Sequence, residues 1–226
     1  MQGRARRDRP AASSGGSERD VRETILAATE ALLGDMRFAD LSVADILTRA
    51  GVSRSSFYFY FAGKHQVLAE LARRAVGEGH TAGGPWLSRR GDADDHLSTL
   101  RDGITAGARL WSAHAPVLRA IVENWRDDET LTTLWGELMD SYTDAAVLRI
   151  EQDQRAGLAR VASTHSRHVA AALTWLGERL YYLAAVGQPP FDDSEVLVDT
   201  LFELWSATVY GPEPDPSTHG HTEPPR

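Results

Sequence analysis

The sequence predicts an all-α protein, and three observations support this: the placement of proline, the spacing of apolar residues and the lack of strand-like alternation. None of the 10 prolines falls between Ala11 and Gly84 or between Val117 and Gln188. Proline costs a helix interior about 3 kcal/mol, so long proline-free segments favour helices. No run alternates apolar and polar residues between turn signals, as a half-buried strand would. We therefore expect about nine helices.

Apolar periodicity and capping residues place four helices in the first third of the chain. In the first helix, apolar residues form one stripe at helical spacing: Val21, Ile25, Ala28 and Leu32. Ser42 is in an N-cap position, with Asp45 three residues later as a capping-box variant, and Gly51 ends that helix. Ser53 caps the next one. The expected ranges are about 18–35, 42–51, 54–60 and 64–76.

Five further helices are expected after a glycine-rich segment, GEGHTAGGPW, which we interpret as a domain boundary. Their expected ranges are about 93–113, 116–126, 128–156, 165–186 and 193–209. Both ends of the chain are predicted to be unpacked tails, because the first is rich in Arg, Ser and Gly and the second in Pro.

Composition excludes several classes of protein. The chain has 226 residues, 42% hydrophobic and 25% charged, which is ordinary for a globular protein. No apolar run approaches the roughly 20 residues of a membrane helix, and the N-terminus lacks the apolar region of a secretory signal. Cysteine is absent, which excludes disulfides, thiolate metal sites and thiol catalysis. We expect a soluble cytoplasmic protein with no metal and no cofactor.

Charge is unevenly distributed along the chain. The whole chain has a formal net charge of −8, whereas residues 1–75 hold 12 Arg and Lys against 9 Asp and Glu, a net of +3. A relatively basic N-terminal segment favours a contact with a polyanion there. Chance variation in composition explains a net of +3 equally well, so charge alone leaves nucleic-acid binding open.

The most specific pattern lies in the segment LSVADILTRAGVSRSSFYFYF, residues 41–61. A short capped helix, a turn at Gly51-Val52-Ser53 and a second short helix predict a helix-turn-helix. Such a motif presents its second helix to the DNA major groove. Val52 is expected to be buried in the turn, and the inner face of the first helix is expected to consist of Val43, Ile46, Leu47 and Ala50.

This segment resembles the N-terminal signature of the TetR family of bacterial transcriptional regulators. The matching residues are Ser42, Val43, Ile46, Ala50, Gly51, Val52, Ser53, Tyr58, Tyr60, Phe61, Gly63, Lys64, Val67 and Leu68. The resemblance implies a DNA-binding regulator that acts on double-stranded DNA. It also implies five segments: a disordered arm (1–17), a helix-turn-helix domain (18–63), a connecting helix (64–80), a ligand-binding and dimerisation domain (81–211) and a disordered tail (212–226).

The chemistry of the side chains suggests which of them contact DNA. Arg54, Ser55 and Ser56 lead the second helix and are candidates to read base edges, with Arg54 able to bind guanine in a bidentate manner. Further candidate DNA contacts, mainly to phosphate, are Ser42, Val43, Tyr58, Tyr60 and Lys64. An exposed, solubilising charge is the alternative interpretation of Arg54.

Two further groups in this region have more ordinary interpretations. Three phenylalanines are expected to pack the N-terminal helices into a small core: Phe57, Phe59 and Phe61. The arginine-rich arm over residues 4–9 either adds electrostatic affinity for DNA or is a solvated tail.

Within the family, the chain is most similar to a branch with a long, aromatic-lined pocket, over roughly residues 20–211. The resemblance is carried by RSSFYFYF and by the last two predicted helices. It implies a pocket for a hydrophobic effector lined by Leu100, Gly107, Trp111, Trp135, Met139, Tyr142, Thr174, Gly177 and Trp205. Two asparagines of that pocket are Thr174 and Gly177 here, and a phenylalanine is Gly107, so we expect a different ligand.

The last two predicted helices carry apolar faces that call for a partner. The apolar residues are Val169, Leu173, Leu176, Leu180 and Leu183, then Val196, Leu197, Leu201 and Leu204. The resemblance implies a four-helix interface between two subunits and a homodimer on a near-palindromic operator. Glu178 and Arg179 are expected to form structural ion pairs.

Two other functions compete with that of a repressor released by its effector. An enzyme is disfavoured because the chain has no glycine-rich phosphate loop, HExxH or Gly-x-Ser-x-Gly motif. His165 and His168 have a spacing that can bind metal, but no carboxylate lies near them in the sequence. A carrier of a lipid-like molecule that does not bind DNA stays open as the alternative. Loss of Arg54 and Tyr58 would abolish a regulator and leave a carrier intact.

Overall fold

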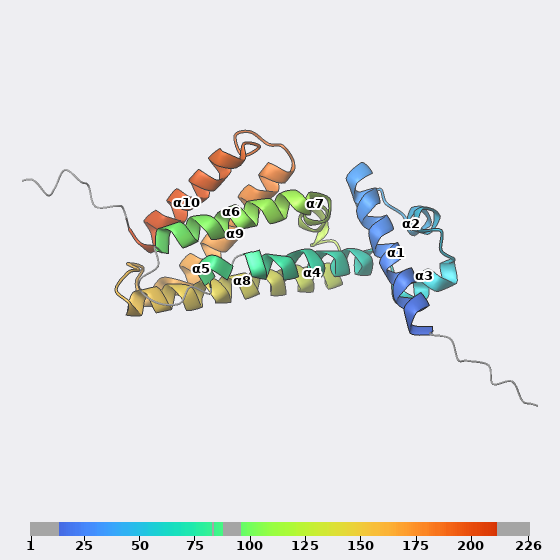
Figure 1. The fold of residues 1–226 in the computed structure, drawn as a ribbon, viewed down its shortest axis with the longest axis horizontal. Helices are drawn as coiled ribbons and strands as arrows, with labels where there is room; N and C mark the ends of the chain where they lie inside the picture. Colours follow the sequence, from blue (N-terminus) through green and yellow to red (C-terminus); the bar gives the residue numbers. More distant parts are fainter. Residues whose placement is uncertain (1–13, 83, 88–95, 212–226) are drawn as a thin grey trace, which may run out of the picture. The chain divides into compact units, whose positions relative to one another are not determined.

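The computed structural model describes residues 14–82, 84–87 and 96–211 (Figure 1). Throughout these residues the regular structure is helical, with α-helices α1 to α10 and one 3₁₀ turn. The all-α prediction is therefore confirmed. The chain divides into two compact units between Leu68 and Ala69, which we describe separately. The predicted tails lie largely outside the described residues, except that α1 begins at Ser14, inside the predicted arm.

The first unit contains the four N-terminal helices close to where the sequence predicts them. They are α1 (Ser14–Asp35), α2 (Val43–Ala50), α3 (Arg54–Tyr60) and the start of α4 (Lys64–Ala82). A complete capping box starts α2, because the Asp45 amide donates to the Ser42 hydroxyl and the Ser42 amide donates to the Asp45 carboxylate. Gly51, with φ of 64°, takes the left-handed conformation that ends α2.

Burial in the first unit corrects three sequence predictions. Phe57 and Phe61 are buried as expected, but Phe59 is 74% exposed, so it contributes nothing to the core. Val52 is only half-buried in the turn. On the inner face of α2, Ile46 alone is fully buried, while the other three predicted positions are half-buried. Helix α3 has only seven residues, so only one row of its side chains can face the core. Phe57, together with Phe61 just after the helix, occupies that row, and Phe59 points away from it.

The second unit holds the remaining helices, listed here with their bounds. They are α5 (Gly84–Leu87), α6 (His96–Ala113), α7 (Ala115–Asn124), α8 (Glu129–Arg155), the 3₁₀ turn (Ser163–His165), α9 (Ser166–Ala185) and α10 (Ser194–Val209). The five long helices begin and end within three residues of the predictions. The end predicted for α4, at Val76, is wrong because the helix continues to Ala82. The short α5 and the 3₁₀ turn were not predicted.

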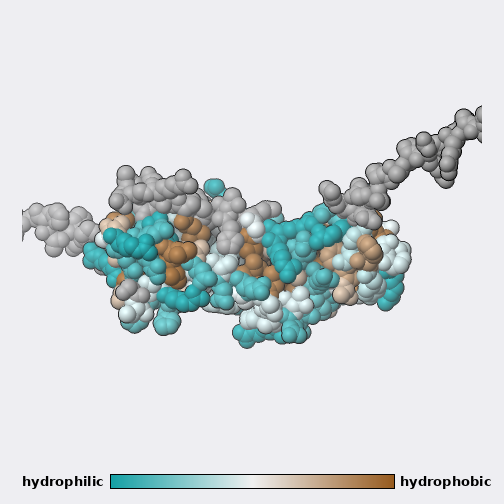
Figure 2. Space-filling model, turned by 90° about the horizontal axis from the view of Figure 1, so that it is seen from below, coloured by the Kyte–Doolittle hydropathy of each residue, from teal (hydrophilic) through white to brown (hydrophobic). Residues whose placement is uncertain are grey.

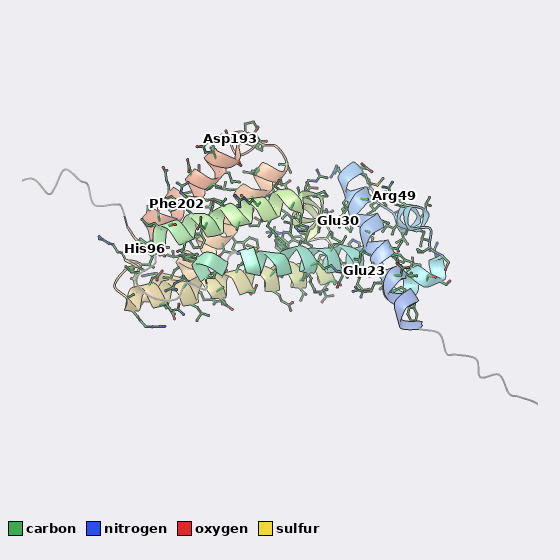
Figure 3. The ribbon with its side chains drawn as sticks, viewed as in Figure 1. Glu23, Glu30, Arg49, His96, Asp193 and Phe202 are labelled. Carbon is green, nitrogen blue, oxygen red and sulfur yellow. The ribbon has the colours of Figure 1, made fainter. Side chains whose placement is uncertain are left out.

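Helices α6, α8, α9 and α10 form the body of the second unit. Helix α9 packs against α8, α6, α7 and α10, and α10 also packs along α6 (Figure 1). One contact between α6 and α10 is made by Arg101, which bonds Asp199 at 2.6 Å and lies 4.5 Å from the ring centroid of Phe202. Phe202 and Asp193 both lie on the α10 side of this unit (Figure 3). Asp193 caps α10 by accepting a hydrogen bond from the Glu195 amide at 2.8 Å.

A buried polar network ties α5, α8 and α10 together. The Trp86 indole N–H donates to the Tyr210 hydroxyl at 2.9 Å, and that hydroxyl donates to the Asp153 carboxylate at 2.8 Å. Arg149, one turn earlier on α8, donates to the other Asp153 oxygen at 2.6 Å. Removing one partner of a buried ion pair leaves a charge uncompensated, so this network fixes the position of Trp86 in the fold.

Candidate DNA-binding surface and candidate effector cavity

Helix α3 is short and well capped, and its outer face carries most of the predicted DNA contacts. Ser53 starts the helix by accepting a hydrogen bond from the Ser56 amide at 3.1 Å. Side chains exposed on this helix are Arg54, Ser55, Tyr58 and Phe59, and those half-buried are Ser56 and Tyr60. The Arg54 guanidinium lies 5.5 Å from the ring centroid of Tyr58. A cation and a phenol side by side on one exposed helix face can bind phosphate or base edges.

Phe59 is the residue of this face that the sequence prediction missed. A phenylalanine that is 74% exposed gains little from burial in its own fold, and the neighbouring Tyr60 ring meets it edge-on with the ring centroids 4.9 Å apart. The FYFYF run places aromatic residues at every position from 57 to 61, so helical periodicity could have separated Phe59 from Phe57 and Phe61.

Lys64 is held inside the first unit rather than extended into solvent. Its ammonium donates to the carbonyls of Phe38, Ala39 and Leu41 at 2.9, 3.3 and 2.7 Å, and lies 4.7 Å from the Phe38 ring centroid. Partial burial lowers the pKa of Lys64, and the nearby Asp40 carboxylate opposes that shift. All three donors of the ammonium are engaged, so the side chain ties the start of α4 to the loop before α2.

Ser42 and Val43, at the start of α2, are the other two predicted DNA contacts in this unit. The Ser42 hydroxyl is exposed and bonded to the Asp45 carboxylate, which lowers the pKa of that carboxyl. Val43 is half-buried. The geometry therefore leaves the outer face of α3, more than the start of α2, free to meet a partner.

The second unit encloses a cavity of about 180 Å³ whose lining comes from α4 to α10. All nine residues predicted to bind the effector line it: Leu100, Gly107, Trp111, Trp135, Met139, Tyr142, Thr174, Gly177 and Trp205. The prediction missed several others, among them Val76, Trp86, Ile104, Glu178 and Tyr181. Most of the lining is aliphatic or aromatic, which suits a hydrophobic ligand.

Aromatic rings define the shape of the cavity. Trp111 and Tyr181 stack with their centroids 6.0 Å apart, and Trp86 meets Trp205 edge-on at 5.4 Å. The Tyr181 hydroxyl donates to the Ile104 carbonyl at 3.0 Å. Burial raises the pKa of Tyr181 far above its usual range, so this phenol stays neutral at physiological pH.

Tyr142 is the second phenol of the cavity. Its hydroxyl donates to the carbonyl of Val76 on α4 at 3.4 Å, a long hydrogen bond. Burial raises the pKa of Tyr142 to about 12, so it is also neutral at physiological pH.

The two cavity glycines differ in what they permit. A Cβ atom on Gly107 would lie 2.7 Å from the Tyr181 hydroxyl oxygen, closer than real Cβ contacts come, and 3.0 Å from Tyr181 Cζ, which is also tight. Gly107 therefore makes room for the Tyr181 ring. A Cβ on Gly177 would lie 3.8 Å from Tyr181 Cε2, an ordinary van der Waals contact. Gly177 is not required by the packing.

Glu178 is a charged residue in the lining, whereas the sequence predicts it only in a structural ion pair. Its side chain is 4% exposed, and its nearest cationic atom among the described residues is Arg179 Nε, at 3.9 Å. Burial raises the pKa of Glu178, and the Arg179 charge partly opposes this. The position was detectable, because Glu178 follows Gly177 and lies one turn after Thr174 on the same helix.

The apolar faces of α9 and α10 are divided between the core and the surface. Leu173, Leu180, Leu197 and Leu201 are buried within the unit, so these four predicted interface positions belong to its own core. Trp175, Val186, Val196 and Leu204 stay exposed. On the face drawn in Figure 2, hydrophobic residues form small patches within a mostly hydrophilic surface.

The described residues contain neither a candidate metal site nor a candidate membrane-spanning helix. Within residues 14–82, 84–87 and 96–211, no cluster of three or more His, Asp or Glu could hold a metal ion. His165 and His168 are both exposed. No helix in the same ranges combines the length and the hydropathy required to cross a membrane.

Comparisons with known proteins match both units. Residues 25–71 match the family described as "Bacterial regulatory proteins, tetR family", and residues 100–211 match "Transcriptional regulator EthR, C-terminal domain". The HTH-type transcriptional regulator EthR of Mycobacterium tuberculosis is 33% identical over 208 residues, or 91% of this chain and 93% of the relative. EthR of Mycolicibacterium smegmatis is 28% identical over 213 residues, covering 94% and 96%.

Solved structures agree with this fold. The TetR family transcriptional regulator PfmR of Thermus thermophilus superposes with a TM-score of 0.63 at 17% identity, over 84% of this chain and 99% of that one. Salmonella enterica GusR gives 0.65 at 14%, over 84% and 95%. The resemblance inferred from the helix-turn-helix residues and the last two helices is confirmed: the chain belongs to the TetR family of DNA-binding transcriptional regulators and is similar to EthR over most of its length.

Proposed function

We propose that the protein is a homodimeric repressor that binds a near-palindromic operator and leaves it when a hydrophobic small molecule occupies the cavity. The observation that carries this proposal is that one chain combines a capped helix-turn-helix with an aromatic-lined cavity in a separate unit. The alternative of a carrier that does not bind DNA leaves the exposed face of α3 without a purpose. We further propose that the protein acts in the cytoplasm, by binding and not by catalysis.

The DNA contacts are proposed to centre on α3. Arg54, Ser55 and Ser56 are placed to reach base edges, and Tyr58 and Tyr60 to donate to phosphate. We add Phe59, because an exposed aromatic side chain on a recognition helix can pack against a thymine methyl group.

Ser42, Val43 and Lys64 are assigned a weaker role in DNA binding. The backbone N–H groups of Val43 and Lys64 lie at the starts of α2 and α4, where phosphate binds favourably. The Ser42 amide is engaged by the Asp45 carboxylate, which leaves only the Ser42 hydroxyl for DNA. The Lys64 ammonium is engaged with three carbonyls, so we propose that it positions the motif and does not itself contact DNA.

Dimerisation is proposed to use the exposed parts of α9 and α10. Trp175, Val196 and Leu204 are each about 40% exposed, and large apolar side chains that gather on one surface mark an interface. A two-fold dimer would place two recognition helices about 34–36 Å apart, one turn of the DNA duplex.

We propose that α4 transmits the effect of the ligand. Val76 of α4 lines the cavity, and Lys64 at the start of the same helix is bonded to the loop before α2. A ligand that displaces Val76 would shift α4 and with it the helix-turn-helix. The population would then move towards dimers whose recognition helices no longer match the operator spacing.

The experiment that tests the proposal is selection of genomic DNA fragments by the purified full-length protein, followed by footprinting of the enriched fragments. A regulator should enrich a few fragments with a two-fold protected pattern, and the Arg54→Ala/Tyr58→Ala variant should enrich none. Glu137→Ala, an exposed change on α8, is the matched control and should select the same fragments as wild type. A wild-type protein that enriches no fragment above the variant would refute the proposal.

A further inference from the structure

We propose that the effector is an organic cation, a hydrophobic amine whose ammonium group pairs with the Glu178 carboxylate inside the cavity. This inference rests on the proposed role of the cavity as an effector site. It adds the charge and chemical class of the ligand, which an aromatic lining alone does not specify.

The first argument is that the Glu178 carboxylate is buried in the cavity wall without a matching donor. The side chain is 4% exposed, and no described residue donates a hydrogen bond to it. Its ion pair with Arg179 is long, at 3.9 Å, and Arg179 is 54% exposed with its guanidinium 5.1 Å from the Tyr182 ring centroid. Burial of a carboxylate that accepts no hydrogen bond and has one distant ion-pair partner is unfavourable, so a cation in the cavity would stabilise its charged form.

The second argument is that the described lining holds no fixed positive charge that would pair with Glu178 or attract an anion. None of the residues that line the cavity is Lys, Arg or His, so Glu178 is the one charged residue of the described lining. The Tyr181 hydroxyl already donates to the Ile104 carbonyl, which leaves its oxygen as an acceptor and not as a donor towards the cavity. Tryptophan faces also attract cations, and Trp111, Trp135 and Trp205 are all in the lining.

The competing hypothesis is that Glu178 is protonated and that the ligand is a neutral molecule. If Glu178 stays protonated in the empty cavity, it could donate a hydrogen bond to a carbonyl or an alcohol. An ammonium ligand would instead hold the carboxylate in its charged form, since an opposite charge at close range favours ionisation. The two hypotheses therefore predict opposite orders of affinity for ligands that share a body and differ in head group.

The test uses three probes with one phenyl body: 2-phenylethylammonium, 2-phenylethanol and phenylacetate. A cavity of about 180 Å³ is comparable to one of about 150 Å³ that binds benzene. Isothermal titration calorimetry at pH 7 would measure their affinities for the full-length protein. We expect the ammonium to bind at least tenfold more tightly than the alcohol, and phenylacetate to bind most weakly.

The matched variants are Glu178→Gln and Glu137→Gln, which remove the same charge from the cavity wall and from the exposed surface of α8. We expect Glu178→Gln to weaken the ammonium tenfold or more without weakening the alcohol, and Glu137→Gln to behave as wild type. Alcohol binding as tight as ammonium binding in the wild type would overturn the inference, and so would binding of none of the probes. This comparison needs only wild type, so it holds even if Glu178→Gln does not fold.

A parallel DNA-release assay separates this inference from the proposed function. If the ammonium binds tightly through Glu178 but leaves DNA affinity unchanged, the ligand class stands and the effector role of the cavity fails. If the alcohol releases DNA while the ammonium does not bind, the effector role stands and the cation is wrong.

Discussion

Replacing Gly107 by alanine should reveal how tightly Tyr181 is fitted into the cavity. The new Cβ would lie 2.7 Å from the Tyr181 hydroxyl oxygen, so the ring has to shift, and we expect its hydrogen bond to the Ile104 carbonyl to be lost. The lost hydrogen bond costs about 1 kcal/mol, and overpacking costs about 1–3 kcal/mol. Alanine in place of glycine inside a helix stabilises by about 1 kcal/mol. The net expectation for Gly107→Ala is a loss of about 1–3 kcal/mol.

A double-mutant cycle isolates the contact from the change in helix propensity. In a Tyr181→Leu background, Gly107→Ala should stabilise by about 1 kcal/mol, because the clash is gone and the propensity gain remains. Gly177→Ala is the matched control on α9, since its Cβ meets Tyr181 only at 3.8 Å and should stabilise in both backgrounds. Urea unfolding of the four proteins gives the coupling energy between positions 107 and 181. A coupling below about 0.5 kcal/mol would refute the steric argument, because independent sites add within that margin.

Three further predictions address the other sites. Lys64→Met should lower the free energy of unfolding of the protein by about 2 kcal/mol or more, measured by urea unfolding, because three carbonyls lose a charged donor; an unchanged stability would show that these bonds contribute nothing. Phe59→Ala should weaken operator binding at least tenfold in an anisotropy titration without lowering the melting temperature, whereas a lower melting temperature with intact DNA binding would return Phe59 to the core. Burial raises the pKa of Glu178 above its ordinary 4.5, so its ionisation destabilises the fold as pH rises through that range. Glu178→Gln should therefore melt like wild type near pH 4 and at a higher temperature at pH 7.5, and a difference that shrinks as pH rises would contradict the assigned burial.

Much of the fold could be predicted from residue types at fixed spacing. Ser42 with Asp45, Gly51 and Ser53 determine where α2 ends and α3 begins, because each meets a local requirement of capping or of positive φ. The apolar periodicity of the long helices was equally informative. A capping residue or a glycine with positive φ acts on backbone groups within a few residues of itself, so tertiary packing does not change where it starts or ends a helix.

The sequence predictions were wrong or incomplete at positions where tertiary packing determines whether a side chain is buried and what it contacts. Five consecutive aromatic residues, from Phe57 to Phe61, all suit a core, and only the direction of the helix exposes Phe59. Lys64 looks like a free cation in the sequence, yet its partners are carbonyls 23 to 26 residues away. The nine cavity residues carried over from the family resemblance do line one cavity, but Glu178 was expected only in an ion pair, and its place in the cavity wall was missed.

The most direct test of the account is a fluorescence anisotropy titration of the intergenic DNA that flanks the gene, with wild type and the Arg54→Ala/Tyr58→Ala variant. Specific protein–DNA complexes have dissociation constants of roughly 10 nM or below and resist competitor DNA. The account predicts a saturable wild-type complex of this kind at near-physiological salt and a loss of about 100-fold or more in the variant. Equal affinities of the two proteins, both abolished by moderate salt, would indicate only counterion-driven association and would contradict recognition by α3.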